Sequence, residues 1–357
     1  MNDREKKLLT LRGKYPTMSL EELQTRSSYK WKSTITRKIK HYKKQKMIFG
    51  PIYYIDYGKL CKNQLNQMYC IIESHNPYEK VVSYLKLIKS IKWAYPVRSP
   101  HRTALDVSFT SSNDDKTRDL LQLLKDNHII AHYTIYSYHC NKHTENPNFC
   151  GDFVPSFNTL LDPCDVPDMS CGHHDTTWNT CDIAVLPYFE TGYKACKFVE
   201  ILRAERILQN PWTYEQIKYS FKKMVTHKLI QKTYIIYPIA ARECTMFLLY
   251  LKTETPDIIQ RILYNFGKES RIYKHYVFNE NWGILCCVSH PLFFPNLLQK
   301  LDMDVIQGKE LYQIDSIIGM TPIDLPTELK CFNMENQTLE YPYQVYKETI
   351  KEQLEQE

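Results

Sequence analysis

The chain has 357 residues, and at about 150 residues per domain this length predicts two or three domains. Hydrophobic residues make up 43% and aromatic residues 13% of it, which excludes a disordered chain, because such chains lack the side chains that form a core. The longest stretch without a formal charge, residues 281–299, contains two prolines, so no membrane span is expected. The first residues are charged and do not resemble a signal peptide, so we expect a cytoplasmic protein.

The positive charge is concentrated at one end of the sequence. The 46 Lys and Arg residues exceed the 40 Asp and Glu residues by six, yet residues 1–50 alone hold 14 basic and four acidic side chains. This segment therefore carries +10, which leaves −4 for the other 307 residues. Such an asymmetry indicates a polyanionic partner for the N-terminal region.

The two halves of the sequence correspond to each other. Apolar positions between residues 35 and 48 match positions between 217 and 230 at an offset of 182. The segments 68–72 and 120–124 then match later segments at offsets of 178 and 177, in the same order. We interpret this as a tandem repeat. Two unrelated domains with ordinary amphipathic spacing remain the alternative.

The N-terminal segment is predicted to form three helices and a β wing. A first helix over Asp3–Lys14 precedes Pro16, and Ser19 with Glu22 forms a capping box that starts a second helix. The wing is predicted at residues 52–55, after a Gly-Pro turn. The third helix has apolar residues spaced four, four and three apart, which are Trp31, Ile35, Ile39 and Tyr42. These elements are those of a winged helix-turn-helix.

Each half continues with alternating strands and helices in the order β-α-β-β-α-β, which is the ferredoxin-like split. In the first half, Asn76 is expected to cap a helix that begins at Pro77 and runs to about Lys89. The remaining predicted elements there are strands at 69–72, 91–95, 104–109 and 129–138 and a helix at 114–126. In the second half they are strands at 246–251, 271–278, 283–288 and 310–315 and helices at 256–266 and 295–301.

The predicted fold class is therefore α+β, with two tandem repeats of a winged helix-turn-helix followed by a ferredoxin-like domain. In the second head, a first helix near Asp182 is followed by a segment, residues 193–210, that is longer than a normal turn. The predicted domains are a first winged helix-turn-helix (1–60), a first ferredoxin-like domain (66–139), a Cys/His-rich linker (140–181), a second winged helix-turn-helix (182–240), a second ferredoxin-like domain (244–318) and an acidic C-terminal tail (319–357), expected to be a surface helix without a site.

The order of elements and the basic segment from Ile35 to Gly50 resemble the Lrp/AsnC family of bacterial and archaeal transcription regulators. Members of that family usually carry one head and one body and dimerise through the body sheets. The resemblance therefore implies that the two bodies of this chain pack as an intramolecular pseudo-dimer. It also implies binding of double-stranded DNA, a small-molecule effector at the body interface, and a homo-oligomer.

The third helix of the first head is the candidate DNA-reading element. A recognition helix places its side chains in the major groove, while Lys and Arg neutralise phosphates and release counterions. A solvated charged helix face is the alternative interpretation. The candidate DNA-binding residues are Tyr29, Lys30, Lys32, Ser33, Thr36, Arg37, Lys40, Lys43 and Lys44.

The corresponding helix of the second head is less basic. It keeps Lys218, Lys222, Lys223 and Lys228, but Tyr219, Ser220 and Val225 stand where the first head has Arg37, Lys38 and Lys43. We therefore expect the first head to supply most of the DNA affinity.

The linker between the repeats is rich in cysteine and histidine. Zinc requires about four Cys or His donors in a tetrahedron, and pairs such as Cys140-x-x-His143 favour this arrangement. There is no Cys-x-x-Cys knuckle, so unliganded cysteines in a packed or flexible loop remain the alternative. The candidate ligands of a zinc ion are Cys140, His143, Cys150, Cys164, Cys171, His173 and Cys181.

No catalytic signature stands out, and 10 glycines in 357 residues argue against a nucleotide-binding fold. We therefore expect a sequence-specific DNA-binding transcription regulator that is not an enzyme. Two alternatives remain: a non-catalytic interaction protein, and an enzyme resembling the tetrapyrrole decarboxylases of the sirohaem and haem d1 pathways, which share the Lrp/AsnC fold. The Gly-Tyr-x-x-Asn-Ala motif associated with those enzymes is absent from the bodies, and Gly192-Tyr193 lies before the second head.

Overall fold

The computed structural model describes residues 1–98, 103–190, 197–295, 297–314 and 322–356. The chain forms two compact units, each assembled from three separate stretches of sequence. Unit 1 comprises Met1–Ile52, Cys140–Met169 and Lys232–Ile314, and unit 2 comprises Tyr53–His139, Ser170–Gln231 and Asp315–Glu357. Each unit therefore combines the helical head of one half of the sequence with the body of the other half.

The chain changes unit inside two strands that pair with each other, β1 (Ile48–Ile55) and β7 (Ile230–Ile236). The backbone N–H of Tyr237 donates to the carbonyl of Met47 at 2.8 Å, and at the other end of the sheet the N–H of Asp56 donates to Leu229 at 2.9 Å. The two strands are therefore antiparallel. The β wing predicted after the first head is a single strand, whose partner strand follows the second head.

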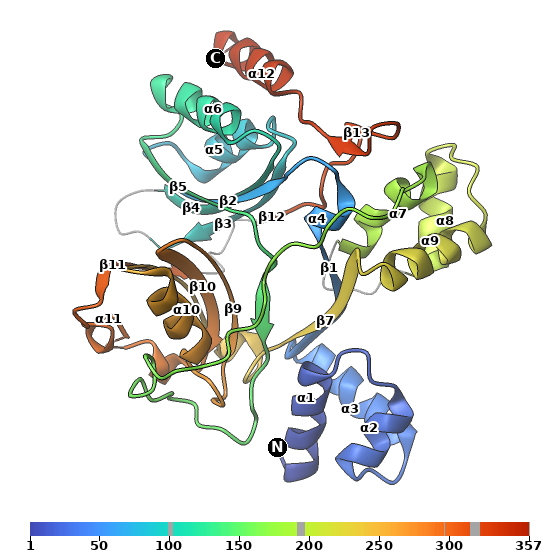
Figure 1. The fold of residues 1–357 in the computed structure, drawn as a ribbon, viewed down its shortest axis with the longest axis vertical. Coiled ribbons are helices and arrows are strands. Elements are labelled where there is room, and N and C mark those ends of the chain that lie inside the picture. Colours follow the sequence, from blue (N-terminus) through green and yellow to red (C-terminus); the bar gives the residue numbers. More distant parts are fainter. Residues whose placement is uncertain (99–102, 191–196, 296, 315–321, 357) are drawn as a thin grey trace. The chain divides into compact units, whose positions relative to one another are not determined.

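The first head consists of three helices that pack around a small apolar cluster (Figure 1). Leu8, Leu23 and Ile35, one from each helix, are fully buried in it. The predicted first helix is confirmed residue for residue. Trp31, in contrast, was wrongly placed on the apolar face, because it is the N-cap of the third helix and 61% exposed. The helices are α1 (Asp3–Lys14), α2 (Leu20–Ser27) and α3 (Lys32–Lys44).

The body of unit 2 has the element order β-α-β-β-α-β and an antiparallel sheet with the strand order β5-β2-β4-β3. Asn76 does not cap the helix as expected, because its side chain donates to the carbonyls of His128 and Ile129, and Pro77 takes the N-cap position. The helix also ends at Leu85, before the predicted Lys89. The elements are β2 (Asn66–Ser74), α5 (Tyr78–Leu85), β3 (Ile91–Val97), β4 (Thr103–Ser111), α6 (Asp114–Asp126) and β5 (His132–Tyr138).

The body of unit 1 repeats this arrangement with the strand order β11-β8-β10-β9, and a short strand, β6 (His143–Glu145), extends the β9 edge. Gly283 lies where β10 passes beneath a helix, because a Cβ there would approach Leu263 Cδ1 to 2.5 Å. The last residue of the predicted strand 310–315 lies outside the described residues. The elements are β8 (Thr245–Thr253), α10 (Pro256–Asn265), β9 (Tyr273–Asn279), β10 (Trp282–Ser289), α11 (Leu297–Lys300) and β11 (Ile306–Ile314), with 3-10 turns at Ala241–Glu243 and Pro291–Phe293.

The second head also has three helices, α7 (Thr180–Glu190), α8 (Phe198–Ile207) and α9 (Tyr214–Thr226). The segment 193–210, expected to be an unusually long turn, contains α8, although its residues 193–196 lie outside the described residues. The Gly192-Tyr193 pair also lies outside them. Buried Glu205 accepts hydrogen bonds from Tyr188, Asn210 and Trp212, which ties α8 to its neighbours.

The C-terminal segment ends in a helix, as expected, and one side of this helix is buried in unit 2. Tyr346 and Ile350 of α12 (Tyr343–Glu355) are buried, and α12 packs against α6 (Figure 1). The hydroxyl of Tyr343 accepts hydrogen bonds from the backbone N–H groups of Ser112 and Asn113 at the start of α6. The remaining short elements of unit 2 are α4 (Tyr57–Leu60), β12 (Ile323–Asp324), β13 (Phe332–Asn333) and β14 (Thr338–Leu339).

The linker is ordered by packing within each unit. In unit 1, β6 pairs with β9, and the side chain of Asn146 bonds to the backbone of β7. In unit 2, the N–H of Gly172 donates to the Asp56 carboxylate at 3.0 Å, and Trp178 is buried. Across the described ranges of the chain, no helix is both long enough and apolar enough to cross a membrane.

Candidate nucleic-acid interface

The three helices of the first head have the arrangement of a helix-turn-helix. In the capping box of α2, the N–H of Glu22 donates to Ser19 Oγ at 3.2 Å, and the N–H of Ser19 donates to the Glu22 carboxylate at 2.7 Å. The helix stops at Ser28, whose left-handed φ of 60° turns the chain. Four residues later α3 begins, with Ile35 and Tyr42 buried on its inner side. A second helix followed by a short turn and a third helix is the geometry that presents a recognition helix to the major groove.

The outward side of α3 carries a stripe of exposed polar and basic residues. Ser33, Arg37, Lys40 and Lys44 follow one another at spacings of four, three and four, so they share one face opposite Ile35 and Tyr42. We call these four residues the outer stripe. In the part of the chain that the structure describes, none of its three cations forms an ion pair, so their charges face solvent.

Three other predicted DNA-binding residues, Lys32, Thr36 and Lys43, have hydrogen-bond partners within the head, although Lys32 and Lys43 stay exposed. Lys32 pairs with Glu21, and Lys38, which neighbours the candidates, pairs with Glu5 at 2.5 Å. Burial would raise the pKa of Glu5, but its bonds from Lys38 and the Asn2 backbone outweigh this effect and lower the pKa. Lys43 donates to the carbonyl of Gly50 at 2.5 Å. Thr36 is also used locally, because its hydroxyl donates to the Lys32 carbonyl at 3.1 Å.

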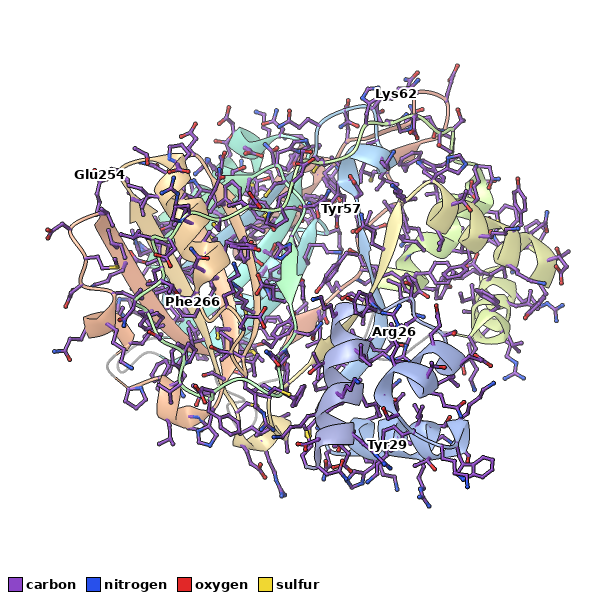
Figure 2. The ribbon with its side chains drawn as sticks, turned by 60° about the horizontal axis from the view of Figure 1, so that its bottom comes forward. Arg26, Tyr29, Tyr57, Lys62, Glu254 and Phe266 are labelled. Carbon is purple, nitrogen blue, oxygen red and sulfur yellow. The ribbon has the colours of Figure 1, made fainter. Side chains whose placement is uncertain are left out.

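The turn before α3 packs inward on one side and stays exposed on the other. Tyr29 lies against the apolar cluster of the head, as labelled in Figure 2, and burial raises the pKa of its hydroxyl. Tyr29 is half-buried and lines a surface hollow with Lys30, so its contact with DNA stays a prediction. Lys30 is exposed, with its Nζ 5.2 Å from the ring centre of Trp31. Of the nine predicted residues, the structure thus places the outer stripe, Lys30 and Lys43 on the surface without a carboxylate partner among the described residues, and Lys43 donates instead to the Gly50 carbonyl.

Gly50 lies near the start of β1, soon after α3. Its φ is +106°, a conformation that L side chains rarely adopt, and a Cβ there would lie 2.9 Å from the backbone N of Ile52. The Gly50 carbonyl is the acceptor for Lys43, so one exposed lysine of α3 is engaged by the backbone of β1. The head therefore holds α3 in position with some of the same cations that the sequence pattern assigned to DNA.

The second head presents a different face. On α9, Tyr219 is 65% and Val225 44% exposed. Lys223 is bound inside the head by buried Asp182 at 2.6 Å, and Lys218 lies 3.4 Å from Glu215. This face is therefore mixed in character, with exposed apolar side chains at positions where α3 is basic.

The structure does not assemble the predicted zinc site. The candidate ligands Cys140, His143, Cys150 and Cys164 belong to unit 1, while Cys171, His173 and Cys181 belong to unit 2. No group of three or more His, Cys, Asp or Glu side chains that could hold a metal ion occurs among the described residues, which include all seven candidates.

The individual contacts of these residues are ordinary. His143 contacts Glu145 at 3.5 Å, and the Cys140 thiol donates to the Phe278 carbonyl at 3.6 Å. Burial raises the pKa of the Cys140 thiol to about 11, and burial also raises the pKa values of Cys164 and Cys181. In the metal-free chain the thiol form is therefore favoured, and a metal would have to displace these protons on binding.

No protein-family model matches the chain, and no curated protein matches it. Among solved structures, the siroheme decarboxylase NirDL aligns with a TM-score of 0.45 and 10% identity over 99% of this chain and 100% of that chain. B. subtilis LrpC aligns with a TM-score of 0.31 and 12% identity over 39% and 94% of the two chains. The Mycobacterium tuberculosis leucine response regulatory protein LrpA aligns with a TM-score of 0.29 and 16% identity over 39% of this chain and 92% of that chain. At these TM-scores the likenesses establish neither the fold family nor the function of this chain.

Proposed function

We propose that the protein binds double-stranded DNA through the outer stripe of α3 and acts as a sequence-specific transcription regulator. The observation that supports this proposal is the presence of three exposed cations, Arg37, Lys40 and Lys44, on one face of the third helix of a helix-turn-helix. Cations on such a face can contact phosphates, while polar side chains beside them can reach base edges in the groove.

The remaining parts of the molecule have supporting roles in this proposal. The two halves share the order of a three-helix head and a β-α-β-β-α-β body, and α3 and α9 both have 13 residues. We interpret them as tandem repeats of a winged helix-turn-helix and a ferredoxin-like domain. The first head supplies the DNA affinity, and the bodies serve oligomerisation or effector sensing.

A salt titration tests the proposal. Binding of the full chain to a fluorescent duplex is measured by anisotropy between about 50 and 300 mM KCl, since each phosphate contact contributes about 0.9 to the slope of log affinity against log salt concentration. The triple variant Arg37→Gln, Lys40→Gln, Lys44→Gln is expected to lower that slope by about 2.7 and to weaken binding.

The chain offers a matched control on α9. The variant Lys218→Gln, Lys222→Gln, Lys228→Gln removes the same number of charges from the second head and is expected to keep the native slope. An unchanged slope in the α3 variant, or an equal loss in the α9 variant, would refute the assignment of the first head. Selection of bound duplexes from a random pool tests sequence specificity. A bound pool without any enriched sequence would refute the proposal of a sequence-specific regulator. A tetrapyrrole absorption band in purified protein that binds no DNA would favour the decarboxylase alternative.

A further inference from the structure

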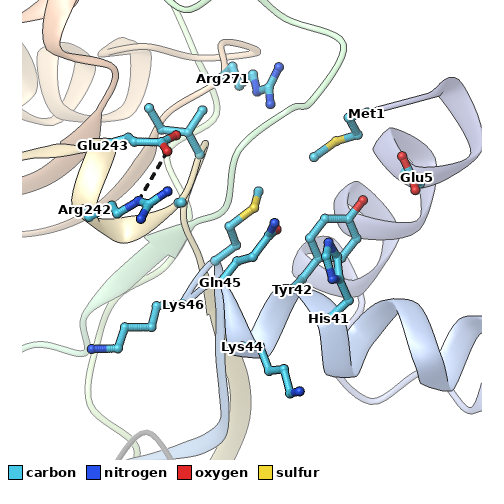
Figure 3. Close-up of a pocket in the computed structure, with 13 residues that line it drawn as sticks. Met1, Glu5, His41, Tyr42, Lys44, Gln45, Lys46, Arg242, Glu243 and Arg271 are labelled. Carbon is cyan, nitrogen blue, oxygen red and sulfur yellow. Dashed lines mark ion pairs between the residues drawn. The ribbon is translucent and has the colours of Figure 1, made fainter.

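A cavity of about 710 Å³ lies beside the C-terminal end of α3. Its wall is formed by the start of α1, the end of α3 with the turn after it, residues 239–243, and Arg271. All of these residues belong to unit 1. Figure 3 shows Arg242 and Glu243 on one side of the cavity and Tyr42, His41 and Glu5 on the other.

The wall carries more positive than negative charge. Its cations are Lys44, Lys46, Arg242 and Arg271, and its carboxylates are Glu5 and Glu243. Both carboxylates already have partners, because Glu5 pairs with Lys38 outside the cavity and Glu243 lies 3.6 Å from Arg242. Among the described residues, Lys44, Lys46 and Arg271 have no carboxylate partner. An anion entering the cavity would therefore meet unneutralised cations.

Arg271 is fixed in place before any ligand binds. Its Nε and Nη2 donate to the Pro238 carbonyl at 3.2 and 3.0 Å, and its guanidinium lies 4.3 Å from the ring centre of Phe153 and 5.0 Å from that of Phe149. A guanidinium has five N–H donors, so several remain for a carboxylate or phosphate oxygen. A cation that is already immobilised loses little conformational freedom when it binds.

The rest of the wall is mainly apolar, and His41 and Gln45 are its polar members. Met47 is buried in the cluster that joins the first head to β7, and Tyr42 and Ile239 complete the apolar part of the lining. Burial is the main cause that raises the pKa of the Tyr42 hydroxyl well above its ordinary value, so this ring offers an uncharged surface. A cavity of several hundred Å³ with an apolar wall and a few fixed polar groups is typical of a small-molecule site.

We propose that this cavity binds a small organic acid, with the acidic group held by Arg271 and Lys46, the exposed Arg242 adding positive charge at the rim beyond its contact with Glu243, and the apolar body against Tyr42, Met47 and Ile239. Lys44 belongs both to the cavity wall and to the outer stripe. An acid held by the other cations of the wall brings a negative charge beside Lys44 and so reduces the positive charge that attracts DNA phosphates, and the two ligands therefore oppose each other. This coupling rests on the proposed DNA binding, whereas the acid site does not.

Binding of phenylacetate to the DNA-free full chain tests the site, by calorimetry and ligand-observed NMR. The matched neutral probe is 2-phenylethanol, and inorganic phosphate supplies the charge without the apolar body. We expect phenylacetate to bind more tightly than either. The variant Lys46→Gln with Arg242→Gln alters two cavity side chains whose ends lie in solvent, and it should raise the phenylacetate Kd about tenfold or more, as expected for the loss of charge-assisted hydrogen bonds.

Two further variants make the result specific. Ala240→Leu narrows the cavity without changing its charge and should also weaken the binding of phenylacetate. Lys7→Gln with Lys252→Gln removes two exposed charges elsewhere in unit 1 and should leave binding unchanged. Equal binding of 2-phenylethanol or of phosphate, or native phenylacetate binding by the Lys46, Arg242 variant, would overturn the site.

The coupling has its own readout. Saturating phenylacetate is expected to lower the salt slope of DNA binding by about 0.9, the contribution of one phosphate contact, and the Lys46, Arg242 variant should lose this response. Phenylacetate that binds without changing DNA affinity overturns the coupling. Phenylacetate binding by a protein that does not bind DNA would instead retain the site and reject the proposed function.

Discussion

Asn146 is expected to hold the linker segment to the first head and to β7. Its Nδ2 donates to the Tyr234 carbonyl at 2.9 Å, and its Oδ1 accepts from the Ile236 N–H at 2.8 Å. A weaker third bond reaches the Gly13 carbonyl at 3.4 Å. Ile236 is fully buried and Tyr234 nearly so, which leaves little room for water to replace these bonds.

Asn146→Ala leaves a backbone donor and a backbone acceptor without partners. Each unsatisfied buried group costs about 1–3 kcal/mol, and because both bonds are only partly buried we expect the lower part of the combined range, a loss of about 2–4 kcal/mol for local opening at this place. Because a chain of two units need not unfold in one step, the measurement is amide hydrogen exchange at Ile236. With about 1.4 kcal/mol per factor of ten, protection should fall about 30- to 700-fold.

Asn148→Ala is the matched control, two residues away. The Asn148 side chain bonds to Glu269 at 3.0 Å at an exposed site, where water can substitute, so we expect a change within about 0.5 kcal/mol. Native protection of Ile236 in Asn146→Ala, or equal losses in both variants, would refute this account of how the linker is held.

Two other predictions concern titration and thiol chemistry in unit 1. Burial would raise the pKa of Glu145, but bonds from His143 and the charge of Lys274 outweigh it and lower the pKa below the ordinary 4.5. Its stabilising contribution is therefore present above about pH 4.5 and is lost as the pH falls through the folded pKa, so urea titrations of Glu145→Gln should show lower stability at neutral pH and a flatter acid loss. If the free energy of unfolding of Glu145→Gln fell as steeply with decreasing pH as that of the native chain, this account of Glu145 would be contradicted. At about pH 7.5 iodoacetamide should label exposed Cys150 before Cys140, whose pKa is raised to about 11. Added zinc should not slow the labelling of Cys140, Cys150 or Cys171. Slower labelling in the presence of zinc would support the zinc site predicted from the sequence.

Local patterns predicted much of the secondary structure. The bounds of α1 and α6 follow directly from capping residues and apolar spacing, and the strand order of each body follows from the β-α-β-β-α-β sequence of elements. The second helix of the second head was missed for a physical reason. Val199 and Ile207 of α8 are exposed at 44% and 82%, so its apolar residues do not trace one buried face.

The candidate interface could be predicted only in part. Helical spacing identifies which residues of α3 share a face, but it does not show which acids lie opposite them. Glu5, 33 residues before Lys38, and Glu21, 11 residues before Lys32, neutralise two cations through tertiary contacts. The cavity likewise joins residues near position 45 to residues near position 240, and no local motif links these segments.

The discontinuity of both units has a consequence for how the chain is made. The first head leaves the ribosome early, yet unit 1 is complete only when residue 314 has been synthesised, and unit 2 requires residues up to its C-terminal helix. Loops of such length delay the contacts that close each unit, and partly built sheets expose unpaired edges in the meantime. A half of the chain made alone should therefore contain a head and a body that each lack the partner they pack against in the full chain. Co-expression of the two halves would supply these missing partners.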